Sequence, residues 1–331
     1  LHPVAHSFPT RRSSDLKALL EQATVALFVI IVVVFSLLSP QFFTWANLVN
    51  LLVQASSLAI IASGITFVLL TAGIDLSVGS IMFAAGVVSG KMVVSGSPIW
   101  LAVIVVILTG LAFGLLNALF IGRFKVVPFI ATLATLYMGR GFGLYLSDTR
   151  AINLPESFLQ IGSARILGIP FPILMMVLIV LVSHLILSRT AWGRQLYAVG
   201  HSREKARKAG LPVDRLLLSV YLISGLFAAI GGLVALAQLG AVSPSFGSQA
   251  EFTAIAAAVL GGTSLFGGRG KVFPGTVVGA VTIQALQSGL VIVNADPYFY
   301  PLITGGVIFM IVFIDSLRNR EQLKRRRRRT L

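Results

Sequence analysis

Long apolar runs, each close to the length that crosses a lipid bilayer, follow one another along most of this chain. A helix needs about 20 apolar residues to span the hydrocarbon of a bilayer. About ten segments fit this measure, and the eighth is short enough to be re-entrant or broken. They cover residues 19–38, 48–70, 78–94, 99–121, 126–146, 170–187, 216–239, 252–266, 272–293 and 302–317.

The composition agrees with a membrane protein. Of 331 residues, 56% are hydrophobic and 11% are charged, whereas about 25% of an ordinary soluble domain is charged. The sequence therefore predicts an all-α, polytopic membrane protein with about ten transmembrane helices, some of them broken or re-entrant.

The basic residues indicate which ends of these helices face the cytoplasm. The formal net charge is +15, and of the 26 lysines and arginines, eight lie in residues 318–329 and seven in residues 189–215. Lysine and arginine in short loops and tails keep those segments on the cytoplasmic side. An N-in, C-in arrangement puts the basic loops inside and the acid-bearing connections at 148–156, 251 and 296 outside. This distribution favours a topological role of the charge over nucleic-acid binding.

The residue inventory gives no support to an enzyme. The chain has no cysteine and four histidines, so it lacks thiolate catalysis and thiolate metal sites. His184 and His201 are not at metal-ligand spacing, and no carboxylates are paired within the apolar segments. We therefore expect no catalytic residue and no metal site, and we set aside a membrane-embedded hydrolase.

Pairs of glycines four residues apart recur in the apolar segments. In a helix this spacing puts both glycines on one face, where they let another backbone approach closely. We expect these pairs to serve helix packing within one chain rather than dimerisation. They are Gly86 with Gly90, Gly110 with Gly114, and Gly275 with Gly279.

The stretch from Thr71 to Ser80 interrupts the apolar pattern between the second and third segments. It contains an aspartate, and a charge at the centre of a bilayer costs about 2.5–3.5 kcal/mol on insertion scales. One interpretation is that Asp75 or Ser77 caps a helix beginning near Val78. The other is that the chain unwinds beside a substrate path, as in transporters with broken helices. The two are compatible, and the candidate path or gating residues are Thr71, Gly73, Asp75 and Ser77.

A second interruption is glycine-rich and covers residues 261–271. It resembles a phosphate-binding loop only superficially, since Val272 follows Lys271 and the required glycine spacing is missing. We therefore expect no ATP hydrolysis by this chain. Thr263 and Ser264 are weaker candidates for the path.

The basic loop at 189–215 contains a predicted short helix. Ser202 is a start signal, good helix formers follow, and Gly210 before Pro212 is a stop signal. A loop needed only for topology would not require an ordered helix. The alternatives are a solvated basic helix and, as we prefer, a docking surface on the cytoplasmic face.

Residues 1–16 fit nothing that follows. They are polar, contain Pro3 and Pro9, and resemble translated sequencing-adaptor sequence, so we exclude them from functional interpretation and expect the natural chain to begin near Lys17 or earlier with different residues. The expected organisation is a transmembrane domain at 17–317 and a basic cytoplasmic tail at 318–331.

Three stretches, in this order, closely resemble the permease subunits of bacterial ABC sugar importers of the ribose type. The similarity extends from Lys17 to Leu317, and the relatives of that family include permeases for ribose, xylose, galactose and autoinducer-2, with branched-chain amino acid permeases more distant. The stretches are LTAGIDLSVG at 70–79, GRQLYAVG at 193–200 and AAAVLGGTSLFGGRG at 256–270.

The resemblance implies an assembly in the bacterial inner membrane. Two permeases, either two copies or close paralogues, would sit on two ABC ATPase subunits that bind ATP and Mg²⁺, and a periplasmic substrate-binding protein would deliver the sugar. No cofactor is expected on this chain. The stretch from Glu204 to Gly210 looks like the coupling helix of ABC permeases, although Lys205 replaces an alanine of the general pattern. The candidate coupling residues are Glu204, Ala206, Arg207 and Gly210.

The expected function is therefore that of the non-catalytic membrane subunit of an ABC importer for a ribose-like pentose or related sugar, working by alternating access. One alternative is an ABC permease for autoinducer-2 or another non-pentose substrate. Another is a secondary transporter driven by an ion gradient, for which Asp75 and Glu251 are the available acidic residues.

Overall fold

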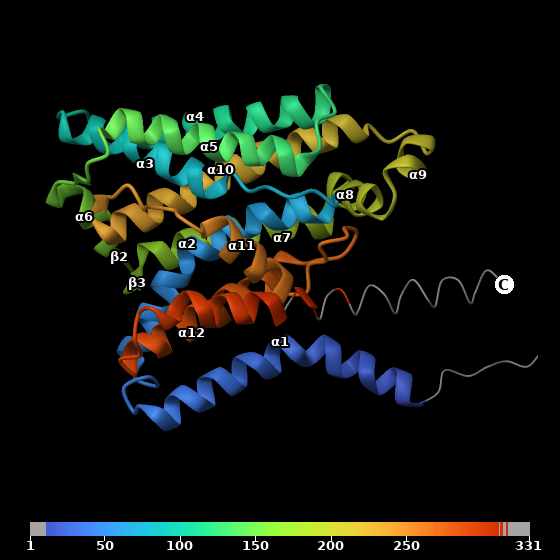
Figure 1. The fold of residues 1–331 in the computed structure, drawn as a ribbon, viewed down its shortest axis with the longest axis horizontal. Helices are drawn as coiled ribbons and strands as arrows, with labels where there is room; N and C mark the ends of the chain where they lie inside the picture. The colour runs from blue at the N-terminus through green and yellow to red at the C-terminus, as the bar shows by residue number, and fades with distance from the viewer. Residues whose placement is uncertain (1–10, 311, 314–315, 317–331) are drawn as a thin grey trace, which may run out of the picture.

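The computed structural model describes residues 11–310, 312, 313 and 316. It is a bundle of helices with two very short antiparallel ladders (Figure 1). The helices are α1 (Arg11–Leu38), α2 (Trp45–Leu70), α3 (Val78–Val94), α4 (Ile99–Ala118) with its π-helical end η1 (Leu119–Arg123), α5 (Pro128–Ser147), α6 (Glu156–Ser163), α7 (Phe171–Arg189), α8 (Ala191–His201), α9 (Arg203–Lys208), α10 (Val213–Leu239), α11 (Ala250–Leu260), η2 (Val272–Thr276), α12 (Val277–Ile292) and a last helix, Phe299–Met310. The strands are β1 (Ile152–Asn153), β2 (Arg165–Ile166), β3 (Ile169–Pro170) and β4 (Ala241–Val242).

Each apolar segment expected from the sequence overlaps a helix among the described residues, although the segment at 252–266 is helical only to Leu260. Five helices among the described residues are long and apolar enough to cross a membrane. They are Trp45–Leu70, Ile99–Arg123, Phe171–Arg189, Val213–Leu239 and Val272–Ile292. The predicted class, a mostly helical membrane protein, is confirmed. Residues 1–10 and the predicted tail at 318–331 lie outside the described residues, and residues 11–16 form the start of α1.

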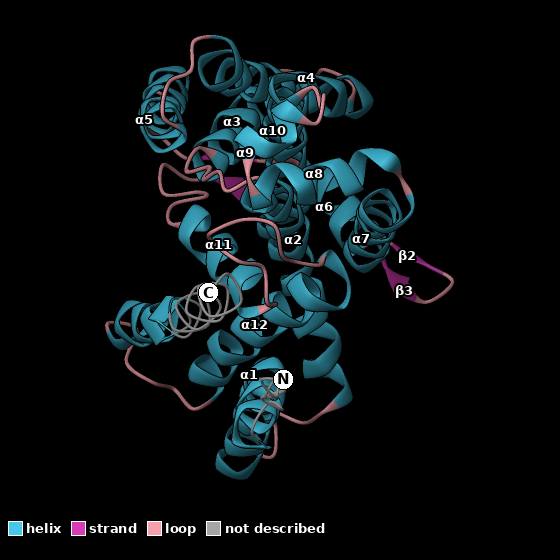
Figure 2. Cartoon of the chain, turned by 90° about the vertical axis from the view of Figure 1, so that its right-hand side faces the viewer, coloured by secondary structure: helices cyan, strands magenta, loops and turns pink. Residues whose placement is uncertain are grey.

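The centre of the bundle is formed by α2 and α10. Both are largely covered by other helices: α10 packs on α2, α3 and α4, and α2 also packs on α7, α11 and α12. Figure 2 shows α2 near the middle of the molecule, between α7, α10, α11 and α12. Large side chains such as Phe67 and Tyr221 are fully buried there. The core therefore lies along α2 and α10, between the two interruptions.

The glycine pairs pack within the chain, as expected. A Cβ at Gly110 would lie 2.5 Å from the carbonyl oxygen of Gly225 in α10, and one at Gly114 would lie 2.8 Å from that of Tyr221. Gly275 and Gly279 approach the α11 backbone in the same way, and Gly86 and Gly90 face Phe246 and Ile152. The small residues thus let α4 and α12 touch their neighbours backbone to backbone.

The short helices and the ladders lie at opposite ends of the bundle. In Figure 1, α8 and α9 lie at one end, and α6 with strands β2 and β3 lies at the other. Strand β1, which follows α5, pairs with β4 in the register Ile152↔Val242. This ladder ties the connection after α5 to the chain that leaves α10.

Two helices begin inside the bundle after a non-helical segment. Residues 71–77 follow α2 and lead to α3, and residues 240–249 follow α10 and lead to α11. The first turns of α3 and α11 meet, because Gly79 packs against Gly247 and Glu251. Their other ends diverge, since Gly90 in α3 faces the β1–β4 ladder, whereas the loop after α11 contacts Gly200 in α8. The fold therefore contains two half-length helices pointing in opposite directions from a shared contact.

The second break includes a segment before α11 in addition to the glycine-rich stretch that the sequence indicated. The glycine-rich stretch at 261–271 is a loop, as expected, but α11 is also preceded by a non-helical segment of turns at 243–249. Glu251, expected in an outside connection, lies instead in the first turn of α11 and is 6% exposed.

Candidate functional site

Asp75 is the centre of a buried hydrogen-bond network in the first break, which is the non-helical segment 71–77 between α2 and α3. Its side chain is 1% exposed. Oδ1 accepts hydrogen bonds from the backbone N–H of Ser77 at 2.9 Å and from its hydroxyl at 2.6 Å. Oδ2 accepts from the hydroxyl of Ser224 in α10 at 2.7 Å. Three donors therefore compensate the burial of this carboxylate.

The network continues through two further helices. The amide nitrogen of Asn117 in α4 donates to the hydroxyl oxygen of Ser77 at 2.8 Å, and the hydroxyl of Thr135 in α5 donates to Asn117 Oδ1 at 2.6 Å. All of these side chains are buried. The segment 75–77 is thus attached to α4, α5 and α10 at once.

The expected cap of α3 is partly wrong. The helix does begin at Val78, but the side chain of Ser77, which precedes it, makes no capping bond. The Asp75 carboxylate binds the N–H of Ser77 itself rather than a free N–H within the helix. Asp75 therefore fixes the turn that leads into α3, as aspartate side chains do when they bond the backbone two residues on.

Thr71 and Gly73 are also buried. The Thr71 hydroxyl donates to the carbonyl of Val68 at 2.8 Å. Gly73 packs against Tyr221, since a Cβ there would lie 2.6 Å from the tyrosine hydroxyl. The four path candidates of the first break thus lie in protein in this structure.

Thr263 and Ser264 lie in the loop after α11 and not in the Asp75 network. Both are buried. Ser264 accepts from the N–H of Phe266 at 3.2 Å and donates its own N–H to Arg269, which closes a turn. The hydroxyl of Thr263 has no hydrogen-bond partner among the described residues and packs against Gly270.

The three stretches that carry the family resemblance meet at one junction. The N–H of Gly268 donates to the carbonyl of Leu70 at 2.9 Å. A side chain at Gly200 would clash with both of these atoms. Only a residue without a side chain lets α8 approach the end of α2 and the glycine loop so closely, which is why glycine stands at this place in the 193–200 stretch.

Two side chains from the 190–215 region strengthen the junction. Arg203 Nη2 donates to the carbonyl of Thr71 at 3.0 Å and to that of Ala72 at 3.5 Å. The hydroxyl of Tyr197 donates to the carbonyl of Gly270 at 2.9 Å. The α8–α9 region is therefore bonded directly to the start of the first break and to the loop that follows α11.

The predicted short helix is present as α9. The Ser202 hydroxyl accepts from the N–H of Lys205 at 3.3 Å, which makes Ser202 the N-cap, and Gly210 ends the turn with a φ of +80°. Ala206 is 5% exposed and anchors the helix, whereas Glu204 and Arg207 point outward.

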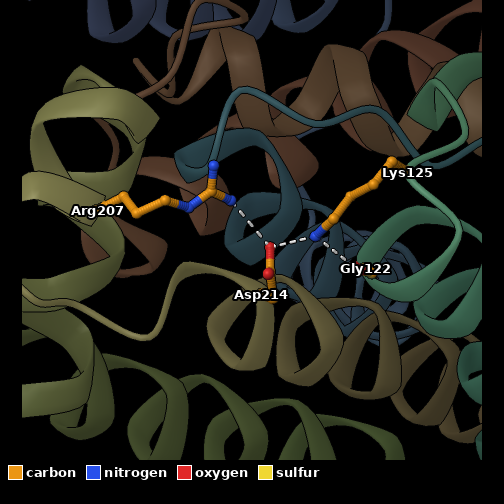
Figure 3. Close-up of polar contacts among 4 residues, drawn as sticks. All are labelled: Gly122, Lys125, Arg207 and Asp214. Atoms are coloured by element: carbon orange, nitrogen blue, oxygen red, sulfur yellow. Dashed lines mark hydrogen bonds and ion pairs between the residues drawn. The ribbon is translucent and has the colours of Figure 1, made fainter.

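Charged pairs hold α9 in place at the surface. Lys208 and Glu204 form a pair at 2.7 Å within the helix. Lys125 at 2.5 Å and Arg207 at 3.2 Å both contact the same oxygen of Asp214 (Figure 3). Because these side chains are about half exposed or more, each pair contributes roughly 1 kcal/mol or less. Their position is informative: Asp214 links α9 to the start of α10 and to the turn after α4.

Several residues of this site were missed by sequence reasoning. Asn117, Thr135 and Ser224 lie in apolar segments, where only their polarity marks them. Arg203 was counted only as topological charge. A systematic listing of polar residues within the apolar segments would have found the first three, but not which residues they contact.

A cavity elsewhere is unsuited to a polar ligand. It has a volume of about 150 Å³ and lies between α4, α6, α7 and α10. Apolar side chains line it, among them Phe158, Met175 and Leu233. This cavity therefore offers no polar group to a sugar, whereas the two breaks do.

Comparison with known proteins points to one family. Residues 47–313 match the model of the branched-chain amino acid transport system / permease component. A ribose import permease protein of Haemophilus influenzae is 37% identical over 90% of this chain and 94% of its own length. A D-allose transport system permease protein of Escherichia coli is 36% identical over 89% and 91%. A fructose import permease protein of Rhizobium meliloti is 36% identical over 85% and 80%. No solved structure matches.

Proposed function

Since the chain belongs to the family of the branched-chain amino acid transport system / permease component, we propose that it is the membrane subunit of an ABC importer that moves a monosaccharide across the bacterial inner membrane. Its similar proteins are named as permeases for ribose, allose and fructose. The chain is the non-catalytic subunit, and a separate ATPase hydrolyses ATP. The observation that carries this function is the similarity over nearly the whole chain, including all three stretches that meet at the junction.

The substrate is a sugar with several hydroxyl groups, and a ribose-like pentose is our first choice. The relatives named for ribose are as similar to this chain as the one named for allose. A six-carbon sugar and autoinducer-2 therefore stay as alternatives for the same site. In such an assembly the substrate-binding protein carries much of the selectivity.

The proposed topology has ten crossings with both ends inside. Five long apolar helices and four shorter ones among the described residues support it, as does the 20-residue helix α5. In Figure 1 the turn after α4, the α8–α9 region and the loop after α11 lie toward the same end of the bundle. That end carries Arg123, Lys125, Arg269 and Lys271, as the positive-inside rule requires.

The proposed coupling route starts at α9. Glu204 and Arg207 would contact the ATPase, Ala206 would keep the helix seated, and Gly210 would end it. Movement of α8 and α9 would reach both breaks through the junction at Leu70, Gly200 and Gly268. ATP and Mg²⁺ would bind to the ATPase and act on this chain by stabilising one conformation more than the other.

The proposed path lies beside the two breaks and is completed by a second permease, either a second copy or a close paralogue. Ser248 and Gln249 are exposed although they adjoin the start of α11 inside the bundle. Polar groups and irregular backbone at membrane depth need protein or water beside them rather than lipid. In the closed conformation Thr71, Gly73, Asp75 and Ser77 would line the shut part of this path, and Thr263 and Ser264 its cytoplasmic end.

The competing function is a carrier driven by an ion gradient. Proteoliposomes that contain the permease, its ATPase and external binding protein distinguish the two. We expect uptake of radiolabelled D-ribose, D-allose or D-fructose to stop when the ATPase is inactivated by mutation and to continue in the presence of a protonophore. Uptake that survives an inactive ATPase and stops with a protonophore would overturn the proposal.

A further inference from the structure

Glu251 is a buried carboxylate without a full set of partners. It lies in the first turn of α11 and is 6% exposed. Its Oε2 atom has no hydrogen-bond partner among the described residues. Asp75, on the other half-helix, has donors for both oxygens. A buried carboxyl oxygen without a hydrogen-bond partner costs free energy and calls for a partner beyond those that the described residues supply.

The unpaired oxygen points at the contact between the two half-helices. A side chain at Gly79 in α3 would clash with Glu251 Oε2 and with the carbonyl oxygen of Gly247. Gly247 in turn has a φ of +69° and packs against the backbone of Gly79. The first turn of α3 therefore lies against this oxygen, and a separation of α3 from the 243–251 segment would uncover it.

A cation lies next to this contact. Arg140 in α5 donates from Nη1 to the carbonyl of Phe246 at 2.6 Å, and its guanidinium lies 5.1 Å from the centre of the Phe83 ring. Phe246 precedes Gly247, whose carbonyl oxygen lies with Glu251 Oε2 against Gly79, so the guanidinium is bonded to the same segment that the carboxylate adjoins. The second break is thus flanked by a carboxylate that can accept hydrogen bonds and a guanidinium that can donate them.

We infer that Glu251 and Arg140 form a binding point for the hydroxyl groups of the transported sugar, which becomes accessible when α3 and the 243–251 segment part. A carboxylate accepts from sugar hydroxyls, and a guanidinium donates to hydroxyl or ring oxygens. A ligand hydroxyl supplies the partner that Glu251 Oε2 lacks in the closed conformation. This inference rests on the proposed function and names a second element of its path.

A carboxylate-to-amide change separates this role from a structural one. In the reconstituted complex with binding protein and ATPase, we expect Glu251→Gln to lower uptake of the best-transported sugar among D-ribose, D-allose and D-fructose at least about tenfold, as expected when a charged hydrogen bond is lost. The thermal unfolding midpoint of the same complex should stay equal or rise, because the variant removes an unpaired buried charge. Glu251→Asp should transport at an intermediate rate.

The matched control is Glu156→Gln, which changes an exposed glutamate in the first turn of α6. It should leave uptake and unfolding unchanged. Uptake by Glu251→Gln above half of the wild-type rate would overturn the inference, and so would a loss of uptake accompanied by a lower unfolding midpoint. Failure of the proposed function would be seen in a different measurement, namely uptake by the wild-type permease that persists when the ATPase is inactive.

Discussion

The two half-helices are built alike but are held differently. The segment before α3 is fixed by Asp75, whose carboxylate has donors from Ser77 and Ser224, and through Ser77 by Asn117. Among the described residues, the segment at 243–249 has one side-chain hydrogen bond to another helix, from Arg140 to the carbonyl of Phe246, and Oε2 of Glu251 in the next turn has no partner. The first break therefore behaves as a fixed support, and the second is the part that can move at low cost.

The largest effect on stability is expected when Asp75, which fixes the first break, is replaced. Asp75→Ala leaves the Ser224 and Ser77 groups without their acceptor, and each such buried group costs about 1–3 kcal/mol. We expect a loss of roughly 2–5 kcal/mol in the free energy of unfolding, measured by thermal or denaturant unfolding of the purified permease complex. Asp75→Asn retains one acceptor oxygen and should lose less than half of this. If the alanine variant unfolds like the wild type, the first break is not a support.

A smaller effect is expected where the two breaks touch. Gly79→Ala places a Cβ against the carbonyl of Gly247 and the Glu251 carboxylate, and overpacking of this kind costs about 1–3 kcal/mol. Because the second break is held by fewer hydrogen bonds than the first, the variant should separate α3 from the segment before α11. It should therefore reduce uptake more than it reduces stability. Gly86→Ala on the same helix is the control, because its Cβ would make ordinary contacts with the side chains of Phe246 at 3.4 Å and Val242 at 3.5 Å. Equal uptake by the two variants would contradict the account.

Arg203 tests the connection of the first break to α8 and α9. Arg203→Ala removes the bonds to the carbonyls of Thr71 and Ala72, and a half-buried charged hydrogen bond is worth about 1.5 kcal/mol. We expect sugar uptake to fall about tenfold while the ATPase stays bound and active, measured as the ratio of sugar moved to ATP hydrolysed. Arg194→Ala, at an exposed position of α8, should leave this ratio unchanged. A proportional loss of both activities in Arg203→Ala would mean that Arg203 does not couple them.

The smallest effect on stability is expected at Glu204 in α9, because this side chain contacts neither break. Replacing Glu204 with Gln breaks its exposed pair with Lys208, and such helix pairs are worth about 0.3–0.5 kcal/mol. Stability should therefore hardly change, whereas co-purification of the ATPase should decrease, and further when Arg207 is replaced as well. Unchanged co-purification and uptake in the double variant would exclude α9 as the docking surface.

The sequence was informative wherever a local rule decided the structure. Apolar length located the helices, the glycine spacing predicted close packing, and Ser202 and Gly210 predicted both ends of α9. The start of α3 at Val78 was predicted as well, although the role given to Ser77 as a cap was wrong.

What could not be predicted depends on residues far apart in the chain. Asn117 reaches Ser77 across 40 positions, and Ser224 reaches Asp75 across 149. The break before α11 was missed because residues 243–249 have ordinary loop composition, and only the contact of Gly247 with Gly79 shows that they lie inside the bundle. For the same reason Glu251 was placed in an outside connection.

The central claim is that α3 and the second break separate during transport while α3 stays attached to α10. Met82 allows one test of both parts, because a Cβ at Gly247 or at Gly232 in α10 would each lie 3.2 Å from Met82 Cβ, close to the spacing of about 3.5–4.5 Å in disulfides. The chain has no cysteine of its own, so Met82→Cys with Gly247→Cys, and Met82→Cys with Gly232→Cys, can be oxidised cleanly. The account predicts that oxidation stops ATP-driven uptake in the first pair, that reduction restores it, and that the second pair transports in both states. Continued uptake by the fully cross-linked first pair would contradict it.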